Sequence, residues 1–414
     1  MSALVLAAVA LFQAAGGAAP WSTALDGAPL VVSGLRVWNG QSFVERELYV
    51  EDGRFVAAPP PDAERLEAKG FAVPPYADAH VHHFTARESA GASRALFLRH
   101  GFAYVANLCG PHGARTSTAE FTNRPDGVDV LFAHGAITGL TAHPVPLYRM
   151  LHRRRGLSDD TFLAMNDDDT IYRVDSEATL DSKLELLLGT GPDLVKVMVS
   201  RIRHREPGST DSLAPDLLPV IVERAHAAGK RVVAHTDDAE DFAFVVRCGV
   251  DWLAHTPGFG RRADEPLGEF LLTPELAREA AQRGTVVITT AGAYDTARAD
   301  NRPAQEAVDE NLRILRDAGV TIAFGSDDWA GPETELRALR THAGFSPREL
   351  LELLCEVTPR VLYPGRSIGS LEPGHEASLL VLANDPLVDS ANLLGITLVI
   401  KEGRVLGSPD SLAK

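Results

Sequence analysis

The 414-residue sequence has few cysteines and, beyond its first residues, no long apolar run. Its three cysteines, Cys109, Cys248 and Cys355, are far apart and form no Cys-x-x-Cys pair, which argues against a cysteine metal site and a disulfide framework. We expect them to be small buried side chains. Basic residues are outnumbered by acidic ones, 40 against 56, and the resulting net charge of −16 disfavours nucleic acid as a partner.

The apolar run at the start, from Ala3 to Phe12, is too short to span a bilayer as a helix. Small residues follow as far as Ala19, as in a secretory signal with its cleavage zone, although the usual preceding basic residues are missing. We interpret residues 1–20 as a signal peptide, with a disordered start as the alternative. A signal would make the protein periplasmic or secreted, whereas without one it would be cytoplasmic. No other segment predicts a membrane span.

Both ends of the chain carry short strand patterns. The octets at residues 49–56 and 399–406 share one pattern: two apolar or aromatic residues, two polar residues, Gly-Arg, and two apolar residues. Each octet is typical of a hairpin around a glycine turn, and residues 379–383 form a further strand pattern. We therefore predict that residues 21–70 and 366–414 build one small composite β-domain, similar to a β-sandwich, with the middle of the chain inserted between them.

The middle of the chain, residues 71–365, alternates short apolar runs with helical stretches. Such alternation predicts right-handed βαβ units and a parallel sheet, hence an α/β fold. Eight runs in this length fit a (β/α)8 barrel of the TIM type better than an open sheet. The runs are residues 71–82, 102–108, 128–138, 193–199, 231–235, 250–255, 285–290 and 320–327. Capping patterns predict helix starts at Thr273 and at Ser346.

Side chains that can bind a metal close several of these runs. In a parallel barrel the catalytic groups lie at the C-terminal ends of the strands. His80 and His82 are two residues apart in the first run, so both point to the same side of a strand. His235, His255 and Asp327 close the fifth, sixth and eighth runs. Imidazole and carboxylate ligands suit Zn²⁺, Mn²⁺ or Fe²⁺, which predicts a metal site built from these side chains.

Lys196 lies inside the fourth run, between strand-forming residues. If its side chain faces the barrel interior, burial lowers the pKa of the amine and favours the neutral form. A neutral amine can take up CO₂ and become a carbamate, which can bridge two cations. The alternative is a lysine at a strand edge whose amine reaches water. The spacing leaves both interpretations open.

In this order along the chain, the six residues resemble the metal ligands of the amidohydrolase superfamily. The local contexts match as well, including Gly-Pro-Asp-Leu-Val-Lys-Val-Met around Lys196 and the tail at residues 358–382. The resemblance covers residues 29–406 and is nearest to the prolidase-like and imidazolonepropionase-like branch, of which some members carry a strand-four lysine. It implies two divalent ions, with Zn²⁺ as the first candidate and Mn²⁺ or Fe²⁺ as alternatives, bridged by a carboxylated Lys196 and a hydroxide.

Three positions depart from the pattern of this superfamily. Pro75-Tyr76-Ala77 stands where Pro-Gly is usual before the first motif. Strand two ends in Asn107 where related chains often have Asp, and Ala254 stands where an acidic residue is common. None of the three removes a ligand, but each bears on substrate contacts or on the groups around the metals.

The ligands and the resemblance together predict hydrolysis of a C–N bond in an amide, peptide or cyclic amide. A metal-bound hydroxide would attack, with Asp327 as general base and then acid. Dipeptides and N-acyl amino acids are the candidate small-molecule substrates, and the sequence leaves a homo-oligomer open. The alternatives are a mononuclear deaminase, an ester or lactone hydrolase, and a catalytically silent scaffold protein. No Glu follows His235 at the deaminase spacing, and the complete ligand set disfavours the scaffold.

Candidate substrate-binding residues lie in segments that follow two of the strands. His143, after the third strand, resembles a substrate-contacting histidine of related chains, with a structural role as the alternative. Arg201 and Arg203 follow the Lys196 strand in an otherwise acidic protein. A guanidinium can bind a carboxylate through two hydrogen bonds, whereas a solvated charge run is the alternative interpretation.

If the two arginines form such a clamp, the Arg201→Ala, Arg203→Ala double variant should raise KM for acidic substrates, because the paired cations are lost. KM for neutral substrates should stay unchanged. Steady-state kinetics on a matched acidic and neutral pair measures this, and equal changes for both would contradict the clamp.

Overall fold

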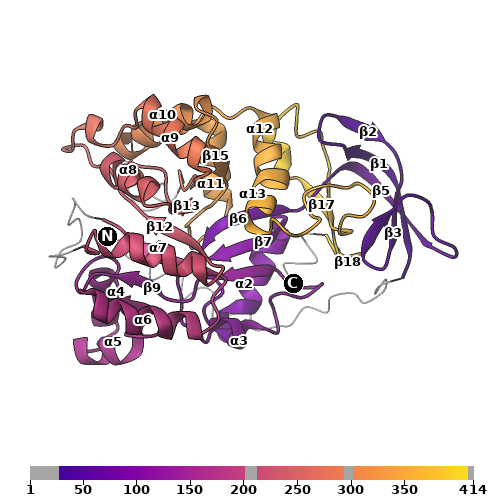
Figure 1. Cartoon of the computed structure of the whole chain (residues 1–414). Helices are drawn as coiled ribbons and strands as arrows, with labels where there is room; N and C mark the ends of the chain where they lie inside the picture. Colours follow the sequence, from indigo (N-terminus) through magenta and orange to yellow (C-terminus); the bar gives the residue numbers. More distant parts are fainter. Residues whose placement is uncertain (1–27, 201–211, 293–301, 409–414) are drawn as a thin grey trace.

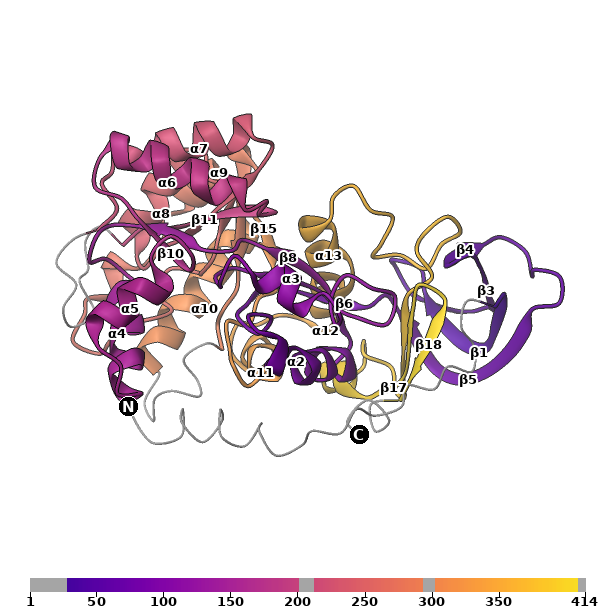
Figure 2. The same ribbon diagram turned by 90° about the horizontal axis from the view of Figure 1, so that it is seen from below.

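The structure is a computed structural model that describes residues 28–200, 212–292 and 302–408. It contains one mixed sheet and two parallel sheets. Figures 1 and 2 show the mixed sheet at one end of the molecule and the parallel strands, covered by helices, at the other. The predicted signal at residues 1–20 lies outside the described residues.

Strands from both ends of the chain pair in the mixed sheet, in the order β18-β17-β16-β5-β1-β3-β4, with β2 paired to β1. Its strands are β1 (Leu30–Trp38), β2 (Phe43–Glu45), β3 (Leu48–Glu51), β4 (Arg54–Val56), β5 (Glu64–Val73), β16 (Leu379–Leu382), β17 (Ile396–Lys401) and β18 (Arg404–Gly407). The two octets form the predicted hairpins, β3–β4 and β17–β18. Their turns lie against each other: a Cβ on Gly403 would lie 3.4 Å from the Cα of Gly53, and both glycines have positive φ. Only glycine satisfies both conditions without strain.

The two parallel sheets have the orders β6-β7-β8 and β10-β9-β11-β12-β13-β14-β15, and every strand pair in them is parallel. Their strands are β6 (Tyr76–Val81), β7 (Phe102–Asn107), β8 (Asp129–Phe132), β9 (Ala136–Thr138), β10 (Ile171–Arg173), β11 (Leu194–Met198), β12 (Arg231–His235), β13 (Trp252–Leu253), β14 (Val286–Ile288) and β15 (Thr321–Ala323). Backbone hydrogen bonds of 2.8 Å link the sheets, from Ala79 N to Phe324 O and from Asp193 N to Phe132 O. The predicted α/β class with parallel sheets is confirmed.

Two of the eight predicted runs are divided between strands. The first run, residues 71–82, divides at Pro74 and Pro75, because proline has no N–H to donate to a ladder. The third run, residues 128–138, divides at His134, whose φ of 56° interrupts the extended backbone. The other six runs each contain one strand. The sequence analysis missed β10, which at three residues is too short to show an alternating pattern.

Helices connect the parallel strands, and two of them begin as predicted. They are α2 (Arg87–Arg99), α3 (Ala114–Thr118), α4 (Val145–Arg154), α5 (Asp159–Asn166), α6 (Glu177–Gly189), α7 (Leu217–Ala227), α8 (Ala239–Arg247), α9 (Pro274–Arg283), α10 (Arg302–Asp317), α11 (Glu333–Thr341), α12 (Pro347–Glu352) and α13 (Thr358–Leu362). Short 3-10 helices lie at Leu267–Glu269 and Ser390–Leu394, and a π-helix, Leu353–Val357, joins α12 to α13. Thr273 caps α9, and Ser346 caps α12 in a capping box. Within the described ranges, no helix has the length and apolar character of a membrane span.

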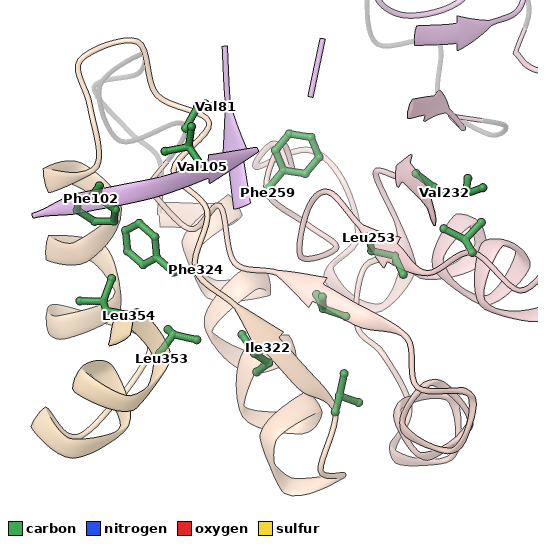
Figure 3. Close-up of a cluster of buried hydrophobic side chains, with 14 of the residues drawn as sticks. Val81, Phe102, Val105, Val232, Leu253, Phe259, Ile322, Phe324, Leu353 and Leu354 are labelled. Carbon is green, nitrogen blue, oxygen red and sulfur yellow. The ribbon is translucent and has the colours of Figure 1, made fainter. Parts of the chain in front are cut away.

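A buried apolar cluster packs helices against the strands that lead to the site (Figure 3). Phe102 on β7 and Phe324 just beyond β15 have ring centroids 5.4 Å apart. Leu353 and Leu354, in the π-helix between α12 and α13, belong to the same cluster. Close packing of this kind fixes the strands, and therefore the directions of the side chains at their ends.

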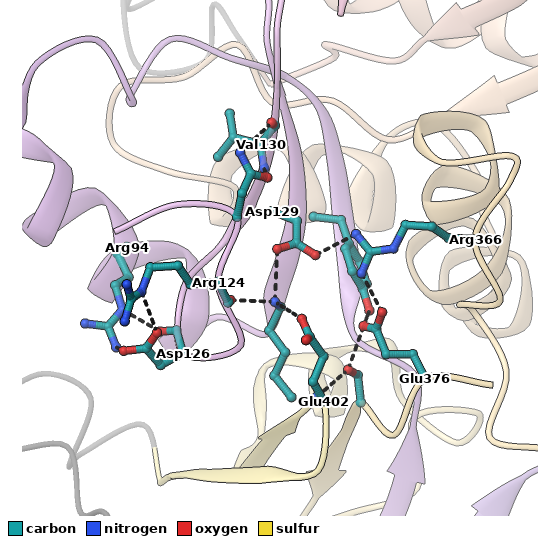
Figure 4. A network of polar contacts seen from close by, with 12 residues as sticks. Arg94, Arg124, Asp126, Asp129, Val130, Arg366, Glu376 and Glu402 are labelled. Atoms are coloured by element: carbon teal, nitrogen blue, oxygen red, sulfur yellow. Dashed lines mark hydrogen bonds and ion pairs between the residues drawn. The ribbon is translucent and has the colours of Figure 1, made fainter. Parts of the chain in front are cut away.

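A buried ionic network joins the mixed sheet to the parallel strands (Figure 4). Lys401 ends β17, and its Nζ lies 3.0 Å from an oxygen of Asp129 on β8 and 2.8 Å from an oxygen of Glu402. Arg366 pairs with the other Asp129 oxygen at 2.7 Å and with Glu376. Carboxylate oxygens of Asp129, Glu376 and Glu402 also lie close enough together to hold a cation. Lys401 and Arg366 already form ion pairs with all three carboxylates, so we interpret the cluster as structural.

The Lys401→Met variant should lower the free energy of unfolding by about 3 kcal/mol, because it leaves the buried Asp129 carboxylate with one cation in place of two. Denaturant unfolding measures the change. The matched control is Arg278→Met, whose ion pair with Glu275 is exposed and should contribute less than about 1 kcal/mol. Equal stability of the two variants would contradict a structural role for the network.

Candidate metal centre

The C-terminal ends of β6 and β15 bring together three of the predicted ligands. His80 lies on β6, His82 directly follows it, and Asp327 lies four residues beyond β15. One oxygen of Asp327 is 3.0 Å from His82 Nε2 and 3.5 Å from His80 Nε2, and the two Nε2 atoms are 3.2 Å apart. His255, two residues beyond β13, is a fourth predicted ligand that lies near them. Its Nδ1 is 3.9 Å from the other Asp327 oxygen. Ligand-capable atoms of His80, His255 and Asp327 all lie within 4.8 Å of one another.

His235 and His143 extend this cluster on its other side. His235 ends β12, and its ring centroid is 4.6 Å from that of His255. The ring of His143, from the segment between β9 and α4, stacks on His235 at the same centroid distance. The predicted substrate-contacting histidine therefore lies beside a predicted ligand. Arg201 and Arg203 fall outside the described residues.

Lys196 is the third residue of β11, and its side chain is buried with a 1% exposed fraction. Its Nζ has no hydrogen-bond partner among the described residues. Burial lowers the pKa of this amine to about 8, although Asp327 and Cys109 oppose the shift. Its positive charge in turn contributes to the low pKa values of His235 and His255, which places it near them. The interior placement is the one that favours a neutral amine.

Burial sets the charges of the other ligands. It lowers the pKa of His80 to about 3 and also lowers the pKa values of His235 and His255, so these imidazoles are neutral near pH 7. Burial alone would raise the pKa of Asp327, but the neighbouring His80 and His82 hold that pKa well below its usual range. Neutral imidazoles around an ionised carboxylate are the donor set that Zn²⁺, Mn²⁺ and Fe²⁺ accept.

Backbone carbonyls orient the first two imidazoles. His80 Nδ1 lies 3.0 Å from the carbonyl oxygen of Ala254, and His82 Nδ1 lies 3.3 Å from that of Cys109. A ring that donates its Nδ1–H to a carbonyl keeps the lone pair of Nε2 free for a ligand bond. Both Nε2 atoms point toward Asp327. The residues therefore fit a metal.

The sequence analysis missed several groups that hold or border the site. Asp78 lies two residues before His80 and accepts hydrogen bonds from the backbone N–H groups of His80 and Ser326, both at 3.0 Å. It therefore ties β6 to the segment that carries Asp327. Phe259 lies parallel to the ring of His255, with centroids 4.0 Å apart. Polar residues at strand ends give a local pattern, whereas the contact between Asp78 and Ser326 joins segments 248 residues apart and gives none.

Comparison with known proteins relates the second half of the chain to one family. Residues 207–406 match the model of the Amidohydrolase family. This part of the chain is therefore similar to the amidohydrolases. An uncharacterized protein of Mycobacterium tuberculosis is 29% identical over 202 residues, 46% of this chain and 52% of that protein. The chain thus spans about half the length of the curated relatives it matches.

Solved structures of an amidohydrolase and a prolidase share the fold. The crystal structure of an amidohydrolase superimposes with a TM-score of 0.73 at 21% identity, covering 92% of this chain and 99% of that one. A prolidase in complex with N-methylphosphonate-L-proline gives a TM-score of 0.71 at 19% identity, covering 92% and 100%. The parallel strands and the helices around them are therefore arranged as in these amidohydrolases.

The Lys196→Met variant should bind fewer metal ions per chain than the unmodified protein, because it removes the buried amine whose carbamate would bridge two of them. Elemental analysis after zinc loading and desalting measures the content. The matched control is Lys69→Met, which changes an exposed lysine and should leave the metal content unchanged. Unchanged metal content in Lys196→Met would contradict a ligand role for Lys196. The metal-free variant should be at least as stable as the unmodified protein, since a buried amine without a partner is costly.

Proposed function

We propose that the protein is a metal-dependent hydrolase that cleaves a C–N bond in an amide, peptide or cyclic amide. The observation that supports this most strongly is the convergence of neutral imidazoles, an ionised carboxylate and an orphaned buried amine at the ends of parallel strands. The proposed ligands of two divalent cations, with Zn²⁺ as the first candidate, are His80, His82, Lys196, His235, His255 and Asp327. Lys196 would act as its carbamate.

Cations bound there would supply a Lewis acid for the substrate carbonyl and lower the pKa of the attacking water. Asp327 is the group we assign to proton transfer. It is ionised, and its side chain is 22% exposed, so it is open to a substrate as well as to the imidazoles. It would accept the proton of the attacking water and donate it to the leaving nitrogen. Its backbone φ of 45° is rare for a residue other than glycine, and the 2.8 Å bond from Asp327 N to His80 O holds it there.

We also propose that the two parallel sheets are parts of one (β/α)8 barrel spanning residues 71–365. The hydrogen bonds between β6 and the segment after β15, and between β8 and the start of β11, support this closure. The mixed sheet would be the composite β-domain of residues 21–70 and 366–414. Its strands come from both ends of the chain, as that proposal requires. The observed end of β5 at Val73 moves the boundary a few residues into the predicted barrel.

For the substrate, we propose a dipeptide or an N-acyl amino acid. The prolidase of similar fold was solved with N-methylphosphonate-L-proline, an amino acid substituted on its nitrogen. His143 lies where a bound molecule would meet it, beside His235, and we propose it together with Arg201 and Arg203 as substrate-binding residues. The burial of Lys196 beside the histidines favours the two-ion hydrolase over a mononuclear deaminase.

The Asp327→Asn variant should lower kcat by about a hundredfold or more, because the amide keeps the shape of the side chain but cannot accept the proton. Amino-acid release from a dipeptide and N-acyl amino acid library measures turnover, and elemental analysis on the same sample reports the metal content. Asp317→Asn, an exposed change on α10, is the matched control and should keep full activity. Undiminished turnover of Asp327→Asn with its metal bound would refute the proton-transfer role.

A further inference from the structure

An exposed tryptophan stands beside the candidate metal centre. Trp329 has a 65% exposed fraction, whereas Trp38 and Trp252 are each 2% exposed. It lies in the segment between β15 and α11, two residues after Asp327. Single exposed apolar side chains are common on protein surfaces, so exposure alone assigns no role. The position of this indole relative to the ligands is what carries the argument.

The indole borders the open side of the ligand cluster. Among the described ligands, the side chains of His82 and Asp327 are 21% and 22% exposed, whereas those of His80 and His255 are 2% and 3% exposed. The ring of Trp329 lies 6.0 Å from the ring of His82, with the two planes 29° apart. A molecule that approaches the cluster from this side therefore passes along the indole.

Another aromatic ring, that of Phe259, covers one face of the His255 ring. The ring of Phe259 is nearly parallel to that of His255, with the planes 8° apart, and Phe259 is only 5% exposed. Phe259 also meets the ring of His235 edge-on, with a centroid distance of 5.6 Å. Its faces are occupied within the protein, so it offers no surface to a substrate. Trp329 differs in keeping most of its surface free.

The backbone that carries Trp329 is held in place. His83 Nε2 lies 3.1 Å from the carbonyl oxygen of Trp329, and an Asp328 carboxylate oxygen accepts a hydrogen bond from Ala330 N at 2.8 Å. A further bond of 3.2 Å runs from Gly331 N to Asp328 O. A ring presented from a fixed turn binds a partner with little loss of conformational entropy. The face of an indole binds flat apolar rings by offset stacking.

We propose that Trp329 is a specificity-determining residue that stacks on an aromatic side chain of the substrate, next to the bond that is cleaved. The proposal rests on the proposed C–N hydrolase function and narrows its substrate class. Among dipeptides and N-acyl amino acids, it selects those with a phenylalanine-like or tyrosine-like group over those with a small side chain.

The kinetic test compares Ala-Phe and Phe-Ala with Ala-Ala on the full metal-loaded chain. Trp329→Ala should lower kcat/KM for the better of the two aromatic dipeptides about tenfold, mainly by raising KM. The value of kcat/KM for Ala-Ala should change less than about twofold. Trp329→Phe should recover most of the loss, because a ring remains. The matched control is Val388→Ala, which changes another exposed apolar residue and should leave kcat/KM unchanged for all three dipeptides. An equal loss on all three dipeptides would overturn the proposal.

A binding test needs no turnover and so separates this inference from the proposed function. The nitroaromatic ring of 4-nitro-L-phenylalanine quenches indole fluorescence at close range. The unmodified protein should show saturable quenching that is mostly lost in Trp329→Phe, while alanine at the same concentration causes none. Quenching that survives in Trp329→Phe would overturn the inference. Loss of quenching in a protein that hydrolyses no C–N substrate would support the aromatic subsite and refute the hydrolase.

Discussion

Lys196 places an amine between parallel strands, where burial removes it from water and the described residues offer it no hydrogen bond. Burial penalises an ammonium there and lowers the pKa of the amine to about 8, which makes the neutral form more accessible than in an exposed lysine. The same burial keeps His80, His235 and His255 neutral. In the proposed function, a divalent cation would bind the lone pairs of these buried groups. The rest of the site follows from that constraint.

The contacts that hold the sheets together also hold the ligands. Asp78 binds the backbone of His80 and of Ser326, and the bond from Asp327 N to His80 O lies beside it. The bonds from Ser326 N to Asp78 and from Asp327 N to His80 O join β6 to the segment after β15, and they fix one proposed ligand against another. The precision of the site therefore comes from backbone hydrogen bonds rather than from the ligand side chains alone, as pre-organised metal sites require.

The sequence was enough to predict the class of fold and the residues that meet at the strand ends, because both depend on local patterns. His235, His255 and Asp327 each close an apolar run, and a run can be recognised without knowing its neighbours. The first run divides at Pro74 because proline cannot donate a backbone hydrogen bond. The sequence analysis read it as one run because the residues on both sides of the prolines are apolar. Trp329 beside His82 could not have been predicted, since that contact joins segments almost 250 residues apart. The network around Lys401 escaped prediction for the same reason.

The pairing of β5 with β16 has a consequence for synthesis of the chain. Phe71 on β5 lies opposite Leu382 on β16, so the strands made first have no partner there until the last strands have left the ribosome. During that interval the parallel strands in between can already assemble, since their contacts are nearer in sequence. The nascent β1–β5 segment meanwhile presents an unpaired edge, of the kind that chaperones shield from aggregation.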